Sequence, residues 1–144
     1  MSRLIECLIV NMEYFFRYLF ILIPLALIDF VWLFLNSKSF YGKNIGHLMA
    51  GKVETLPVVL FYLIYSLGLM ILVVAPLLNN NPSWMKIFGF GAIFGLVAYS
   101  TYDLTNQATL RDWPILVTVV DMVWGSLLTG SVAVIAIWMI KTWR

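Results

Sequence analysis

Charged residues are scarce in this sequence, and their scarcity indicates the class of protein. Only 11% of the 144 residues are Asp, Glu, Lys or Arg, whereas 62% are hydrophobic. A soluble domain carries about 25% charged residues and about 45–50% apolar ones. So few charges cannot cover a surface exposed to water. The sequence therefore predicts an integral membrane protein whose main solvent is lipid.

Cysteine, histidine and basic clusters are also nearly missing. The single cysteine, Cys7, excludes an intramolecular disulfide and a cysteine metal cluster. The single histidine, His47, has no cysteine or second histidine near it, so we expect no metal site and no cofactor. The nine Lys and Arg residues are scattered along the chain, which excludes a basic tract for nucleic-acid binding.

Long apolar runs dominate what is present. A hydrocarbon core of about 30 Å needs about 20 mostly apolar residues per helix, and lipid admits only helices or closed barrels. Four stretches are long enough, and the third of them is apolar as far as Tyr102: residues 14–36, 56–78, 84–108 and 113–140. Short connections favour antiparallel neighbours. We predict a single domain, residues 1–144, that is an all-α, four-transmembrane-helix antiparallel bundle.

Two segments outside these spans have their own patterns. Near the N-terminus, Leu4, Leu8 and Met12 recur at helical spacing. This pattern predicts either a short N-terminal interfacial helix or an extension of the first span. The first connection, residues 37–55, is rich in glycine and resembles a loop, in which Ile45 and Leu48 are spaced for a short interfacial turn of helix.

The basic residues give little information on membrane orientation. With the N-terminus in the cytoplasm, five basic residues lie inside and four outside, which is almost no bias for the positive-inside rule. Arg3 and the terminal Lys141 and Arg144 favour both termini inside. Insertion in both orientations stays open as an alternative.

Aspartates inside the predicted spans are the residues that a lipid environment does not explain. An aspartate at the centre of a membrane helix costs about 2.5–3.5 kcal/mol on insertion scales. The first and third connections must lie on the same side of the membrane. Asp29, Asp103 and Asp121 are all close to that side, so we expect them to converge in one leaflet. In the other leaflet, Arg17 has Glu13 one turn earlier as its expected partner.

Helical spacing places aromatic residues beside these aspartates. Asp29 and Trp32 are three residues apart, as are Asp121 and Trp124, so each pair shares a helix face. On the third span, Asp103 shares a face with Tyr99 and Asn106, and the glycines at 91 and 95 form a GxxxG pair beside that face. We expect this pair to serve packing within the bundle in preference to a dimer contact.

Several motifs are similar to a known family. "YDLTNQATLRDWP" followed by "VTVVDMVWG" resembles a bacterial integral-membrane family, domain of unknown function 2177, and the resemblance extends to "LIDFVWL" and "FYLIYSLGL". The resemblance implies a compact four-helix membrane protein and no particular activity, and we expect it to be a multi-pass protein of the bacterial inner (cytoplasmic) membrane. The positions that match are Asp29, Trp32, Tyr41, Tyr62, Tyr65, Tyr102, Asp103, Thr105, Asn106, Asp121, Trp124 and Gly125.

Our leading hypothesis is a cavity between the four helices, open toward the first and third connections. Carboxylates among aromatic rings suit a small cationic or amphipathic ligand. A carboxylate that gains and loses a proton would suit proton-coupled transport, for which so small a protein would act as a homodimer. Membrane lipid and an unknown small molecule are the other expected partners. The predicted ligand-binding residues are Asp29, Trp32, Tyr62, Tyr65, Tyr99, Tyr102, Asp103, Asn106, Asp121 and Trp124, with Asp103 and Asn106 at the rim of the cavity.

Two alternatives remain open at this stage. A small membrane enzyme could use Asp29 and Asp121 as acid and base on a lipid-like substrate, although the sequence identifies no catalytic set. A non-catalytic membrane subunit could use the same polar residues only as a hydrogen-bonded network that fixes the helix register.

Overall fold

The computed structural model describes the backbone of residues 2–143 and the side chains of residues 12–143. The described chain forms helices and no strand. Four segments are long and apolar enough to cross a membrane: Met12–Leu48, Thr55–Leu78, Trp84–Thr109 and Ile115–Trp143. The predicted all-α fold with four transmembrane helices is therefore confirmed, whereas the prediction of a single domain over the whole chain stays a prediction.

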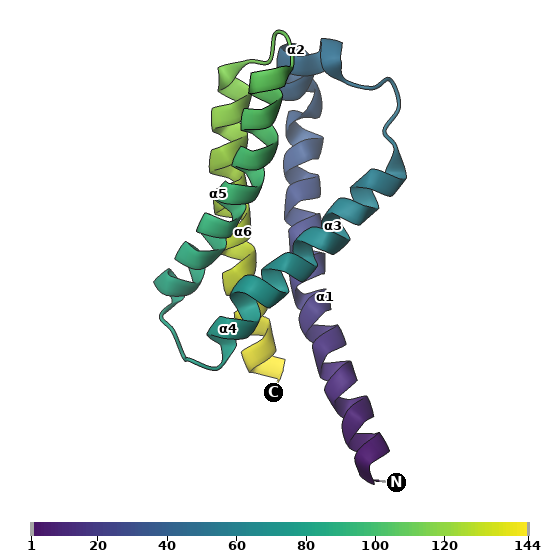
Figure 1. Ribbon diagram of the computed structural model, residues 1–144, viewed down its shortest axis with the longest axis vertical. Coiled ribbons are helices and arrows are strands. Elements are labelled where there is room, and N and C mark those ends of the chain that lie inside the picture. The colour runs from purple at the N-terminus through teal and green to yellow at the C-terminus, as the bar shows by residue number, and fades with distance from the viewer. Residues whose placement is uncertain (1, 144) are drawn as a thin grey trace.

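The four spans alternate in direction (Figure 1). The chain runs up α1 (Ser2–Asn36), down α3 (Thr55–Leu69) and α4 (Ala75–Leu78), up α5 (Trp84–Thr109), and down α6 (Ile115–Trp143). The first and third connections lie at one end of the bundle, and the N- and C-terminal ends lie at the other. Asp29, Asp103 and Asp121 are consequently all in the half of the bundle that carries these two connections.

The N-terminal residues continue the first span. Because α1 runs without interruption from Ser2 to Asn36, the extension of the span is observed and a separate interfacial helix is not. The apolar face predicted from Leu4 and Leu8 falls on side chains outside the described ones.

The first connection is more helical than the sequence indicates. A π turn, η1 (Ser37–Tyr41), continues directly from α1 and is followed by the short helix α2 (Gly42–Ile45) and a 3₁₀ turn, η2 (Gly46–Leu48). Figure 1 shows this segment crossing the end of the bundle. The expectation of a loop directly after Asn36 is therefore wrong, because the chain stays helical while it changes direction, whereas a short helical turn at Ile45 and Leu48 is observed as expected.

The helices α5 and α6 pack most closely, and small residues allow it. A Cβ atom added to Gly91 would lie 2.8 Å from the carbonyl oxygen of Thr129 on α6, and one added to Gly95 would collide with the backbone of Gly125. Only glycine permits helices to approach to this distance. The GxxxG pair therefore packs within the bundle, as the sequence predicted.

The helix α3 packs loosely over its first half. It crosses the bundle obliquely and leans away from α5 and α6 toward its N-terminal end (Figure 1). Its residues from 55 to 61 are all exposed, whereas Tyr65, Ser66 and Leu69 further along are buried. A second π turn, η3 (Met70–Val74), joins α3 to α4. This divergence leaves space between α3 and the other spans near the first and third connections.

Candidate functional site

A cavity of about 620 Å³ occupies this space. Small-molecule sites in proteins measure about 300–1,000 Å³, so the volume suits a small organic ligand. All four spans and the first connection contribute to its wall. The lining residues are Asp29, Trp32, Leu33, Ser37, Tyr41, Ile45, Met49, Phe61, Tyr65, Ala98, Tyr99, Tyr102, Trp113, Asp121 and Trp124.

Asp29 is a buried carboxylate on α1 that is fully engaged by neighbouring helices. Its Oδ2 accepts a hydrogen bond from the Tyr62 hydroxyl of α3 at 2.9 Å, and its Oδ1 accepts one from Trp124 Nε1 of α6 at 2.9 Å. Donors on two other helices therefore meet at one side chain. These bonds offset part of the cost of burying a carboxylate and fix α1 relative to α3 and α6.

Asp121 on α6 is buried as well, but only part of its carboxylate is engaged. Its Oδ1 accepts a hydrogen bond from the Tyr41 hydroxyl at 2.5 Å, and the same hydroxyl accepts one from Trp32 Nε1 at 3.0 Å. No bond to Asp121 Oδ2 is found among the described side chains. Asp121 therefore presents an unused acceptor to the cavity that it lines.

Aromatic rings form most of the remaining wall. The rings of Trp32 and Trp124 stack with their centroids 4.2 Å apart and their planes at 11°. Tyr65 meets Tyr99 edge to face, and its hydroxyl shares a 2.6 Å hydrogen bond with Thr129 Oγ1. These rings are held by packing and by hydrogen bonds, so the wall is preformed around the carboxylates.

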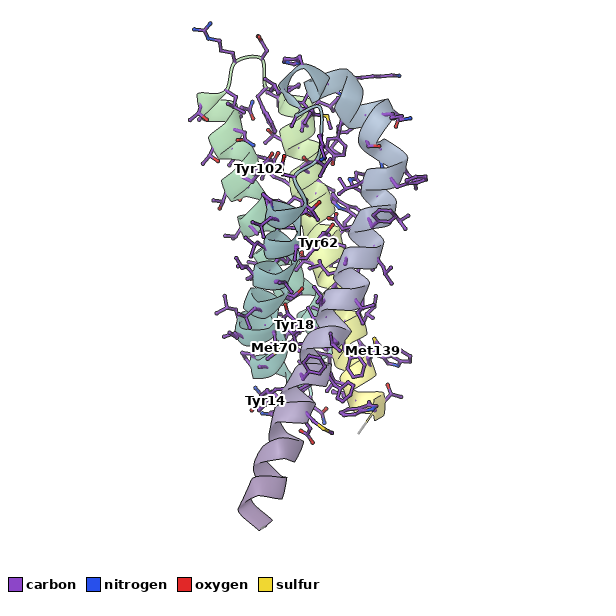
Figure 2. The ribbon with its side chains drawn as sticks, turned by 90° about the vertical axis from the view of Figure 1, so that its right-hand side faces the viewer. Tyr14, Tyr18, Tyr62, Met70, Tyr102 and Met139 are labelled. Carbon is purple, nitrogen blue, oxygen red and sulfur yellow. The ribbon has the colours of Figure 1, made fainter. Side chains whose placement is uncertain are left out.

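Most of the predicted ligand-binding residues lie on this wall. The predicted residues that line the cavity are Asp29, Trp32, Tyr65, Tyr99, Tyr102, Asp121 and Trp124. Tyr62 is not part of the lining and acts through its bond to Asp29. Figure 2 shows Tyr62 farther than Tyr102 from the end of the bundle that carries the first and third connections. Asn106 is half-buried near the end of α5 and is also outside the lining.

Asp103 differs from its predicted position at the rim of the cavity. It is 0% exposed, and neither carboxylate oxygen has a hydrogen-bond partner among the described residues. Asp103 lies one helical turn after Tyr99, on the same face of α5 that packs against α6. Its burial follows from this close packing, which shields a carboxylate that the sequence places near a helix end.

Some lining residues were not predicted. Tyr41 was expected in a loop, yet the π turn directs its hydroxyl to Asp121 and Trp32. Trp113 was not among the predicted ligand-binding residues, but it lines the cavity and donates from Nε1 to Thr118 Oγ1 at 3.0 Å. In the sequence, the only indication that Tyr41 belongs to the site was that it is one of the positions shared with the family.

The polar residues in the other half of the bundle have an ordinary explanation. Arg17 Nη2 donates to Glu13 Oε2 at 2.8 Å, as predicted from their spacing. Within residues 12–143, no group of three or more His, Cys, Asp or Glu side chains is arranged to hold a metal ion.

Comparison with known proteins identifies the family. The model of the family described as "Predicted membrane protein (DUF2177)", a domain of unknown function, matches residues 14–138. No curated protein and no solved structure is significantly similar to the chain. The match covers most of the sequence, so the chain belongs to this membrane protein family.

Proposed function

We propose that this member of the family binds a small cationic or amphipathic ligand in the cavity between its four helices. One observation carries the proposal: a cavity of about 620 Å³ inside the spans is lined by two buried aspartates, and Asp121 keeps one oxygen free. A carboxylate in a low-dielectric site is stabilised by an opposite charge more strongly than it would be in water.

The composition of the wall favours a cation over an anion. Two lining residues are acidic and none is Lys, Arg or His. The tryptophan and tyrosine rings of the wall attract a cation through their electron-rich faces, by about 0.5–2 kcal/mol per contact. An anionic ligand would meet two carboxylates with no compensating charge among the lining residues.

The other expected roles extend this proposal. Transport across the bacterial inner membrane, coupled to protons and carried out by a homodimer, would use the same carboxylates inside the spans. Acid–base catalysis on a lipid-like substrate has less support, because both oxygens of Asp29 already accept hydrogen bonds within the protein. A purely structural network is the alternative that the binding experiment must exclude.

The test is a binding titration with tetraphenylphosphonium, a hydrophobic aromatic cation. The protein in lipid nanodiscs is titrated, and quenching of the tryptophans on the cavity wall is followed by fluorescence. We expect the Asp121→Asn variant to bind at least about tenfold more weakly, which corresponds to about 1.4 kcal/mol. The substitution keeps the shape of the side chain and removes its charge.

Asp112→Asn is the matched control. Asp112 is exposed in the third connection, outside the cavity lining, and its φ of 58° is one that asparagine also adopts. This variant should bind as the wild type does. Equal affinity in all three proteins, with unfolding temperatures unchanged, would contradict the proposal and leave the polar residues a structural role.

A further inference from the structure

The cavity has an exposed border that faces sideways out of the bundle. Four of its lining residues are both apolar or aromatic and exposed: Leu33 of α1, Met49 of the first connection, Phe61 of α3 and Tyr102 of α5. Phe61 is 40% exposed and Tyr102 is 60% exposed. We call these four residues the lateral mouth. It borders the region where α3 leans away from α5 (Figure 1).

The lateral mouth lies largely at the depth of lipid. Tyr102 is seven residues before the end of α5 at Thr109, which is about 10 Å at a rise of 1.5 Å per residue. Phe61 is six residues after the start of α3 at Thr55, and α3 starts farther from this end of the bundle than α5 ends (Figure 1), so Phe61 lies deeper than Tyr102. Asp121, six residues into α6, has a depth similar to that of Tyr102, about 9 Å. The carboxylate is therefore level with the Tyr102 edge of the mouth, and Phe61 extends the mouth toward the middle of the bundle.

The neighbouring surface of α3 is apolar as well. Leu56 is 68% exposed and Ile64 is 67% exposed, so the exposed face continues on both sides of Phe61. A ligand that passes this border would keep its apolar part in contact with apolar side chains and lipid. A polar ligand that crossed this apolar border would lose its contacts with water without compensation.

The charges of the cavity restrict the head group of such a ligand. A phospholipid carries a phosphate, which is normally bound by Arg, Lys or backbone N–H groups. No lining residue is basic, and the carboxylates of Asp29 and Asp121 would repel a phosphate. An ammonium head group without a phosphate needs no basic residue and is attracted by the carboxylates. Asp121 Oδ2 is not engaged by another described side chain and can face this cation.

We infer that the ligand is a single-chain amphiphile with an ammonium head group and no phosphate, which enters from the bilayer through the lateral mouth. The ammonium group lies at Asp121 among the stacked tryptophans, and the alkyl chain leaves between Phe61 and Tyr102 toward lipid. This inference rests on the proposed function, because it needs a cation site at Asp121. It adds the class of the ligand and its route.

The test compares three probes on the protein in nanodiscs: dodecyltrimethylammonium, tetramethylammonium and dodecylphosphocholine. Binding is measured as the part that is lost in Asp121→Asn, which removes the contribution of non-specific partition into lipid. We expect dodecyltrimethylammonium to bind at least a hundredfold more tightly than tetramethylammonium, because the chain stays in an apolar environment. We expect dodecylphosphocholine to bind at least tenfold more weakly than dodecyltrimethylammonium.

The route is tested by a matched pair of substitutions. Tyr102→Lys places a positive charge at the lateral mouth, whereas Leu104→Lys places one at nearly the same depth on an exposed position outside the lining. We expect Tyr102→Lys to weaken binding of dodecyltrimethylammonium at least tenfold and Leu104→Lys to leave it unchanged. Equal effects of the two substitutions would overturn the lateral route.

The outcomes separate this inference from the proposed function. If tetraphenylphosphonium binding depends on Asp121 but the dodecyl chain adds no Asp121-dependent affinity, the cavity binds compact cations and the inference is wrong. Tighter Asp121-dependent binding of dodecylphosphocholine than of dodecyltrimethylammonium would also overturn the inference. If no cation shows Asp121-dependent binding, both the inference and the proposed function are wrong.

Discussion

Asp29 and Asp121 are both buried aspartates, but the structure gives them different tasks. Both oxygens of Asp29 accept hydrogen bonds from other helices, so its carboxylate holds the bundle together. Asp121 accepts from Tyr41 through one oxygen and presents the other to the cavity. Replacing each aspartate should consequently change a different property, stability for Asp29 and ligand affinity for Asp121.

Asp29→Asn should lower stability. An asparagine oxygen can still accept from Trp124 Nε1, but its NH₂ group can only donate to the Tyr62 oxygen, which leaves the O–H of Tyr62 without its acceptor. Leaving a buried polar group without its partner costs about 1–3 kcal/mol. The free energy of unfolding, measured by denaturant titration in detergent micelles, should fall by about that amount. Asp112→Asn is again the control, and an unchanged value for Asp29→Asn would contradict the role assigned to its two bonds.

At the scale of residues, the sequence indicated which polar side chains belong to the site but not their hydrogen-bond partners. Asp29, Asp121 and their adjacent tryptophans were recognisable because a polar group inside an apolar span is costly. The hydrogen-bond partners do not follow helix spacing: Trp124 of α6 donates to Asp29 of α1 and not to Asp121 on its own helix. Which donor reaches which carboxylate depends on how helices rotate and cross, and this is not encoded in spacing along one helix.

At the scale of elements, close packing of α5 against α6 determines which residues are hidden. Glycines 91, 95 and 125 lie along this contact, and the same face of α5 buries Asp103 completely. The contact also holds the ring of Tyr99 directly against Gly125. The position of Tyr99 on the cavity wall therefore depends on the absence of a side chain at residue 125.

Gly125→Ala should disturb this contact. Its new Cβ atom would overlap the Tyr99 ring, and overpacking of this kind costs about 1–3 kcal/mol. Gly89→Ala on α5 is the control, since a Cβ there meets nothing within 4 Å, and alanine is the better helix former. Thermal unfolding in micelles should show a lower midpoint for Gly125→Ala and an equal or higher one for Gly89→Ala. Equal midpoints would show that Tyr99 moves aside freely.

Long helices were predictable from the sequence, whereas the irregular turns were not. Runs of apolar residues in lipid must be helical because no water satisfies the backbone. The π turn Ser37–Tyr41 is not required in this way, because it begins with three polar residues, Ser-Lys-Ser, and is followed by glycine at residue 42. The sequence therefore resembles a loop there, although the turn is what brings Tyr41 to Asp121.

At the scale of the whole molecule, the cavity results from unequal packing of the four spans. The pair α5 and α6 is tight, α6 is the most buried span, and α3 crosses the others obliquely. The sequence predicted that polar residues converge at one end, since this follows from topology alone. It placed Asp103 at the rim because it could not show how closely α5 packs against α6, and this contact is what buries Asp103.

The central claim is that this cavity is where a cation binds, and covalent labelling tests it most directly. The protein in nanodiscs is irradiated with a photoreactive benzophenone that carries a quaternary ammonium group, and the labelled residues are mapped by peptide mass spectrometry. We predict label on the cavity wall, above all on Phe61 or Tyr102, and its loss in Asp121→Asn. Label spread equally over lipid-facing residues such as Phe34 and Phe90, and unchanged in Asp121→Asn, would contradict the claim.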